Sequence, residues 1–254
     1  MALRQKEYGP IQPHYHDAVA RGYEFGSTFI YKFGRNSAVS TDIEDVWDNG
    51  STYAGWLSTG SSITITAEAA ADVAAGTGIQ SVRVSGLDSD YNILVEDVAM
   101  NADTTAGSST LAAFYRVNRV YGLSAGTGQT NAGDIILTAS TGGEEMARIV
   151  AGSGQTLMAV WTVPAGFDMI MENLEITALA TDNVSARLEY LISTDNVWRC
   201  QWTGQVEAQV SLDPLPIIVP EKSDVRIRAT AEVTGGALGT VSASWLGIMI
   251  PSGQ

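Results

Sequence analysis

The chain has 254 residues, 45% of them hydrophobic, and a formal net charge of −14 that comes from 28 acidic and 14 basic side chains. A chain of this length buries about three quarters of its unfolded surface on folding, so its core needs neither a disulfide nor a metal. The negative charge repels phosphate groups, which argues against nucleic acid or a bare membrane surface as a partner.

Residues 1–25 are predicted to be an extended arm that packs on a neighbouring subunit. Two prolines, Pro10 and Pro13, disfavour a helix and keep the segment extended. Aromatic and aliphatic side chains can anchor such an arm. The candidate interface residues in the arm are Tyr8, Ile11, Tyr15 and Tyr23.

The arm also contains both histidines of the chain, His14 and His16. On an extended strand, two residues at this spacing point the same way and can chelate a metal. The pair is similar to the His-x-His of cupin metalloenzymes, but the chain has no third histidine, and Glu24 follows at a longer interval than in that motif. Packing of the arm is therefore the favoured interpretation, and a metal-dependent cupin-like enzyme is an alternative.

Alternating apolar and polar residues predict strands along most of the chain. The clearest runs lie at residues 82–100, 157–166, 185–193, 224–233 and 241–250. The first has two alternating halves around a turn-forming centre, which predicts a hairpin. Within them, Arg187 and Glu189, and likewise Arg226 and Arg228, are predicted to face water. Residues 66–76 are rich in alanine without an amphipathic stripe, which indicates a loop or one short helix.

Small-residue turns every ten or so residues separate these runs, a spacing typical of antiparallel sheets. We therefore predict an all-β fold, an antiparallel β-sandwich or jelly roll, with two sandwich domains after the arm. A glycine pair and an acidic pair near residues 140–155 place the boundary between domains 26–145 and 146–254. A single continuous sandwich is the alternative.

The phrase Ala-Gly-Thr/Ser-Gly occurs three times, at residues 75–78, 125–128 and 151–154. A phosphate-binding loop would need these glycines to open a helix and a Lys-Ser/Thr pair to follow, and neither is present. We predict strand connections in which the glycines supply positive backbone angles.

Residues 88–92 place Asp88, Asp90 and Asn92 at alternate positions, as at the start of a calcium loop. The sixth position of such a loop is Ile93 and not glycine, and Glu96 does not fall at the twelfth. A solvated hairpin turn is therefore favoured over a calcium site.

An acidic cluster surrounds Trp47. Paired carboxylates beside an aromatic platform could hydrolyse a glycosidic bond, but the pattern also fits a polar turn anchored by one buried tryptophan, which we favour. The cluster consists of Asp42, Glu44, Asp45 and Asp48.

Of the six tryptophans, Trp161 and Trp245 lie in alternating runs and are predicted core residues. Trp198 and Trp202 are predicted to share a strand face, where a subunit interface or a place in the core is favoured over a carbohydrate groove. Cys200 between them is predicted to be a small apolar strand residue without a catalytic role, because no histidine is near. We predict no catalytic residue, no cofactor and no metal.

The sequence resembles virion structural proteins of tailed bacteriophages, especially those of marine and environmental phages. The matching phrases cover most of the chain from about residue 25 onward, and they lie at residues 33–47, 76–98, 114–137, 154–166, 220–230 and 241–248.

This resemblance implies β-sandwich or jelly-roll domains that assemble on the phage particle, as capsid decoration, at the neck between head and tail, or in the tail. The expected partners are other phage structural proteins and further copies of the chain, and the expected location is the virion, assembled in the host cytoplasm. No apolar run could span a membrane, and residues 1–10 lack the apolar core of a signal peptide. A carbohydrate- or receptor-binding module of a fibre or tail is the alternative function.

Overall fold

The structure is a computed structural model that describes residues 15–102, 107–179, 183–213, 215, 217–232 and 239–253. Strands dominate the described residues, and the strand pairs they form are antiparallel. The predicted all-β antiparallel class is confirmed. None of the described helical residues forms a helix long and apolar enough to cross a membrane.

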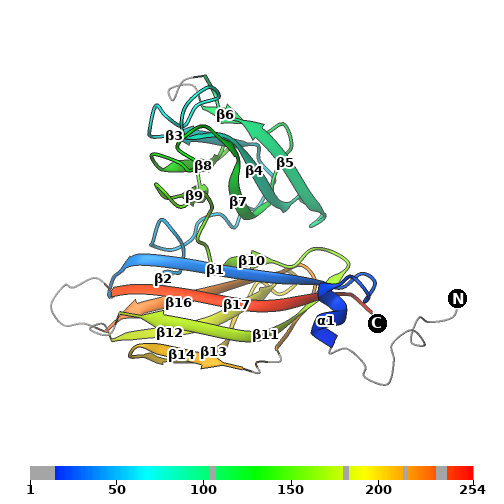
Figure 1. Cartoon of the computed structure of the whole chain (residues 1–254). Helices are drawn as coiled ribbons and strands as arrows, with labels where there is room; N and C mark the ends of the chain where they lie inside the picture. Colours follow the sequence, from blue (N-terminus) through cyan, green and yellow to red (C-terminus); the bar gives the residue numbers. More distant parts are fainter. Residues whose placement is uncertain are drawn as a thin grey trace, which may run out of the picture.

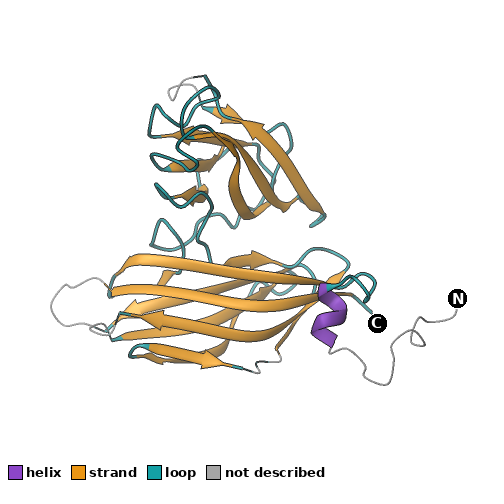
Figure 2. Ribbon diagram, in the orientation of Figure 1, coloured by secondary structure: helices purple, strands orange, loops and turns teal. Residues whose placement is uncertain are grey.

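The strands form two domains, with one domain standing on the other (Figures 1 and 2). The base domain comprises the described residues within 15–46 and 159–253, and the inserted domain comprises those within 47–158. Each domain is organised around its own cluster of buried apolar side chains. The chain therefore begins one domain, builds the other, and then returns to complete the first.

The base domain packs two sheets face to face. Sheet A has the strand order β1-β17-β11-β14, with β15 also on β11, and sheet B has the order β10-β16-β12-β13, with β2 also on β16. These strands are β1 (Thr28–Val39), β2 (Glu44–Asp45), β10 (Val160–Thr162), β11 (Phe167–Ala178), β12 (Val184–Ile192), β13 (Trp198–Val206), β14 (Gln209–Leu212), β15 (Ile217–Val219), β16 (Ser223–Ala231) and β17 (Gly239–Pro251).

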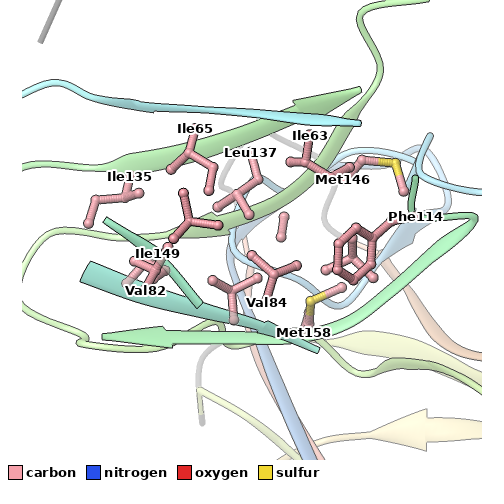
Figure 3. Packing of buried hydrophobic residues seen from close by; sticks show 14 of the residues in the cluster. Ile63, Ile65, Val82, Val84, Phe114, Ile135, Leu137, Met146, Ile149 and Met158 are labelled. Atoms are coloured by element: carbon pink, nitrogen blue, oxygen red, sulfur yellow. The ribbon is translucent and has the colours of Figure 1, made fainter. Parts of the chain in front are cut away.

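The inserted domain has a four-stranded sheet, β6-β3-β8-β9, and a three-stranded sheet, β5-β4-β7. Its strands are β3 (Ile63–Ala67), β4 (Ile79–Leu87), β5 (Ile93–Ala99), β6 (Ser108–Ser109), β7 (Arg116–Ala125), β8 (Ile135–Ala139) and β9 (Glu145–Ile149). Alternation explains this core: β3 buries Ile63 and Ile65, and β8 buries Ile135 and Leu137, while the residues between them, Thr64 and Ile136, are only partly buried. Figure 3 shows these side chains meeting Val82 and Val84 of β4.

The predicted hairpin at residues 82–100 is confirmed as β4 and β5, and residues 68–76 form a series of turns. The predicted division into domains 26–145 and 146–254 differs from the observed packing. Strand β1 pairs with β17 over most of its length, and β2 pairs with β16, so both belong with the C-terminal half. Alternation marks a segment as a strand but does not say which distant strand it pairs with.

The described part of the predicted arm also differs from the expectation. Residues Tyr15–Ala20 form a helix, α1, in place of an extended segment. Its Ala18 and Val19 are buried, and α1 packs against β1. The two prolines that favoured an extended chain lie outside the described residues.

Candidate functional site: the junction between the two domains

The chain crosses between the domains at two adjacent points. Trp47 and Met158 form an antiparallel bridge, and the Ala159 N–H donates to the Val46 carbonyl at 2.9 Å. Strand β1 passes directly beside both crossings at Gly34, where a Cβ atom would collide with the backbone of Val46 and Ala159. Glycine is therefore required at this position by close approach of three chain segments.

A buried ion pair joins the domains. Arg116 of β7 and Asp224 of β16 are 5% and 3% exposed, and two parallel hydrogen bonds of 3.0 Å link the guanidinium to the carboxylate. Arg116 also donates to the Leu57 carbonyl at 2.8 Å, and the Thr162 hydroxyl donates to Asp224 at 2.5 Å. A buried charge pair requires this degree of hydrogen bonding, because each ion has lost its hydration.

Beside this pair, the side-chain amide of Asn118 on β7 forms two hydrogen bonds with the backbone of Thr162 on β10, like those between paired strands. The Asn118 amide accepts from the Thr162 N–H at 2.9 Å and donates to the Thr162 carbonyl at 3.1 Å. Lys32 of β1 donates to the Asn118 carbonyl at 2.5 Å and is 4% exposed. Burial, reinforced by the charge of Arg119, lowers the pKa of Lys32 to about 7.

A series of contacting aromatic rings, with one arginine among them, crosses the junction. Tyr91 contacts Tyr115 edge to face, with ring centroids 5.3 Å apart, and Arg116 lies 4.0 Å from the Tyr115 ring and 5.5 Å from Trp56. Trp56 in turn lies 5.5 Å from Trp198 of the base domain. The domains thus share an aromatic contact as well as a charged one.

These rings line a cavity of about 260 Å³ that we call the junction pocket. Both domains contribute to it, so it exists only when they are joined. Its lining residues are Trp56, Leu57, Ser58, Tyr91, Tyr115, Arg116, Leu191, Ser193, Asn196, Trp198 and Asp224.

Of the predicted interface pair, only Trp198 reaches this pocket. A bulge in the pairing of β12 with β13 skips one residue between Cys200 and Trp202, so Trp202 lies opposite the core residue Leu188 and packs against the base-domain core. Trp198 lies on the other face, where Arg226 stacks 3.7 Å from its ring centroid. The prediction that the two tryptophans share a face is wrong, because the bulge reverses the alternation. Cys200 is exposed on strand β13.

Two side chains that were predicted to face water are buried at this junction. Arg226 and Glu189 are 8% and 6% exposed and are hydrogen-bonded at 2.8 Å. The outer face of sheet B is covered here by the inserted domain, whose core cluster includes Val160 of the strand next to Arg226. The alternation of these strands was predicted correctly, but at the junction their outer face is covered and does not face solvent.

The outer face of sheet A carries an apolar row across four adjacent strands. Phe29, Ile248, Ile170 and Ile218 lie side by side in register on β1, β17, β11 and β15. Their neighbours along the strands point into the core, so the row faces outward. The row is covered at one end, where Ile248 is 0% exposed, and open at the other, where Ile218 is 64% exposed.

Helix α1 covers the closed end of the row. The His16 ring packs edge to face on Phe29 of β1, and its Nε2 atom lies 2.6 Å from the Glu172 carboxylate of β11. Because β1 and β11 flank β17, α1 lies over β17 at the position of Ile248. Tyr15 and Tyr23, predicted interface residues, are about half exposed, whereas Tyr8, Ile11 and His14 lie outside the described residues.

The other candidate sites have structural roles. Asp88 accepts hydrogen bonds from the backbone of Asp90 and Asn92 at 2.9 Å, which confirms the hairpin turn. No group of three or more His, Cys, Asp or Glu residues among the described residues is placed to hold a metal ion. Within the part of the chain described, His16 instead contacts Glu172 and Phe29.

The acidic cluster binds the backbone of the junction. Asp45 accepts from the Tyr53 N–H at 2.8 Å and Asp48 accepts from the Leu157 N–H at 2.6 Å. Burial raises the pKa of Asp45 to about 6 and that of Asp48 to about 7. Trp47 between them is 1% exposed, which confirms a turn anchored by a buried tryptophan.

The three glycine phrases differ from one another. Gly152 and Gly154 have positive φ angles, 78° and 68°, as predicted. The glycines of the other two phrases do not; there, a side chain would collide with neighbouring backbone or with the Asp72 carboxylate. Asp72 is buried and accepts from the backbone of Ile79 at 2.9 Å, so these loops need glycine for close packing.

Most residues of the junction were not predicted from the sequence: Lys32, Trp56, Tyr91, Tyr115, Arg116 and Asp224. One signal was available, because Tyr91 occupies a hairpin turn of Asp and Asn residues where a small residue is expected. The others have no local signal, since their partners are distant in sequence.

No family model matches the chain, and no curated protein matches it in sequence. Similar solved structures include that of the infectious bursal disease virus Gx strain, with 11% identity and a TM-score of 0.28 over 90% of this chain and 72% of that one. The crystal structure of an infectious bursal disease virus VP2 subviral particle is similar at 11% identity and a TM-score of 0.24, over 99% of this chain and 77% of that one. These scores are too low to carry an argument, so the proposals below rest on the described residues.

Proposed function

We propose that the chain is a non-enzymatic structural component of a bacteriophage particle, a capsid-decoration protein or an accessory protein of the head–tail neck. It assembles with copies of itself and with other phage structural proteins in the host cytoplasm and resides in the virion. Its contacts are the surfaces of its sandwiches and its N-terminal segment.

The apolar row on sheet A carries this proposal. The solvent face of a half-buried sheet is normally polar, and a contiguous apolar surface marks a contact with another protein. The row runs from under α1 to the exposed Ile218, so it continues beyond the part that its own helix covers. A second copy can cover the open end in the way that α1 covers the closed end, with its own N-terminal segment.

The rigid junction supports the same role. A particle protein must hold two surfaces in a fixed relation, and here a buried ion pair, a strand-like amide contact and a buried lysine join the domains. Each of these contacts would have to be broken, with loss of its hydrogen bonds, before one domain could move on the other.

Substitution of Ile218 tests the proposal. We expect Ile218→Asp to fold, because Ile218 is largely exposed, and to lower the oligomeric state in sedimentation and the incorporation of the protein into particles. Leu111→Asp is the matched control: Leu111 is 97% exposed but lies on the inserted domain, away from the row. Equal assembly by both variants and the unsubstituted protein would contradict the proposal.

Deletion of residues 1–22 tests the N-terminal segment separately. It removes α1 and uncovers Phe29 and Ile248, so we expect reduced assembly and incorporation. Unchanged particle assembly would show that this segment plays no part.

A carbohydrate- or receptor-binding module of a fibre or tail is the second candidate function. One observation favours it: two tryptophans and two tyrosines line the junction pocket, and aromatic faces are suited to sugar rings. A glycan-array screen of the purified protein tests it.

A further inference from the structure

The junction pocket combines aromatic faces with polar groups, which is the usual composition of a small-ligand site. Its volume of about 260 Å³ lies just below the roughly 300 Å³ at which pockets for drug-sized ligands begin. A ligand the size of one sugar ring fits this range. Asn196, Ser58 and Ser193 supply polar groups around the rings.

Tyr91 is held in a strained conformation to reach the pocket. Its φ angle is 66°, a left-handed value that glycine and asparagine adopt readily and that a bulky side chain rarely adopts. The Ala165 N–H of the base domain donates to the Tyr91 carbonyl at 2.9 Å and holds this turn in place. A bulky side chain in this conformation is unusual, because glycine would adopt it without strain.

The charges of the pocket favour a neutral ligand. The Arg116 guanidinium lies beside the Trp56 ring and is paired with Asp224. Arg226 stacks on one face of Trp198. A cationic ligand would meet these two arginines, and an anion would have to compete with Asp224 for Arg116. A sugar ring needs neither charge: its C–H face packs on aromatic rings, and its hydroxyls bind amides and hydroxyls.

We propose that the junction pocket binds one neutral pyranose ring of a saccharide, with Tyr91 and Trp198 contacting the ring and Asn196 contacting its hydroxyls. This inference rests on the second candidate function and is independent of the assembly role. The oligomerisation and incorporation measurements of Ile218→Asp test that role separately, so either proposal can fail alone.

The first step of the test is a printed array of neutral and acidic glycans. The second step is a titration with free ligands, in which tryptophan fluorescence reports binding. Maltose, cellobiose, lactose and chitobiose are the neutral probes, and sialyllactose and choline are the charged ones. We expect a neutral glycan to bind and to change the fluorescence, because Trp56 and Trp198 line the pocket.

Two turn variants examine the contacts. Tyr91→Gly and Asn196→Gly both replace a residue with positive φ, so both are expected to fold, and each should weaken binding about tenfold or more. Gln129→Gly is the matched control, since Gln129 also has a positive φ but lies outside the pocket, and it should bind normally. Failure of every neutral glycan to bind, a preference for sialyllactose or choline, or normal binding by Tyr91→Gly would overturn the proposal.

Discussion

Asp48 shows how a single side chain can make the stability of this protein depend on pH. It accepts the Leu157 N–H at the crossing between the domains, and burial raises its pKa from 3.8 to about 7. The folded protein therefore retains a proton that the unfolded chain releases between about pH 4 and pH 7. Through that range the contribution of Asp48 to stability falls as the pH rises, and above about pH 7 the loss is complete.

Asp48→Asn should remove this dependence. The asparagine carbonyl can still accept the Leu157 N–H but does not ionise. Because Asp48 is partly exposed, we expect a gain of roughly 1–3 kcal/mol in unfolding free energy at pH 8 and a smaller one at pH 5, measured by urea denaturation. The control is Asp42→Asn, in the same acidic cluster but exposed. A gain that is equal at both pH values would contradict this account.

For single residues, the sequence indicated which side of a strand a side chain lies on better than it indicated whether that side chain is buried. Trp245 was placed correctly in the core because it lies in an alternating run, and Trp47 was placed correctly as the buried anchor of a polar turn. Arg226 was predicted to face water because it alternates with core residues, yet a second domain covers it. Whether an outward-facing side chain is buried depends on what packs on that face, and alternation carries no information about this.

Between strands of the two domains, the ion pair of Arg116 on β7 with Asp224 on β16 is buried and doubly hydrogen-bonded. Removal of one member leaves the other charge buried and unpaired, which costs about 3–5 kcal/mol. We therefore expect Arg116→Met or Asp224→Asn to destabilise the protein by about that amount in denaturant unfolding. The double variant should be less destabilised than the sum of the two.

An exposed ion pair serves as the matched control. Arg83 and Asp97, on the paired strands β4 and β5, are also joined by two hydrogen bonds, of 2.6 and 2.7 Å, but they are exposed to solvent. Arg83→Met and Asp97→Asn should each cost less than about 1 kcal/mol. Similar effects at both pairs would show that burial of Arg116 and Asp224 does not set their contribution.

The location of a strand was easier to predict from the sequence than the strand with which it pairs. Period-two alternation located β4, β5, β12, β16 and β17, since a half-buried strand must alternate whatever it pairs with. The pairing of β1 with β17 joins residues 200 or more positions apart, and no local pattern encodes it. The junction pocket was missed for the same reason: its residues come from both domains.

For the whole molecule, the buried junction predicts cooperative unfolding. Neither domain can unfold without exposing the polar groups that the other satisfies, including Lys32, Asn118 and Asp224. We expect one calorimetric transition whose calorimetric and van't Hoff enthalpies agree. The Arg116→Met/Asp224→Asn double variant should instead show two transitions. Two transitions in the unsubstituted protein would mean that the domains are independent.

The pairing of β1 with β17 also governs the order in which a nascent chain can acquire its structure. The inserted domain is one continuous segment of the chain, so the ribosome completes all of its strands before it produces β10 to β17. Strand β1, made earlier, must wait with its apolar residues uncovered until β17 has emerged. Chaperones that bind nascent chains should therefore associate with the first strand throughout most of translation and release it late.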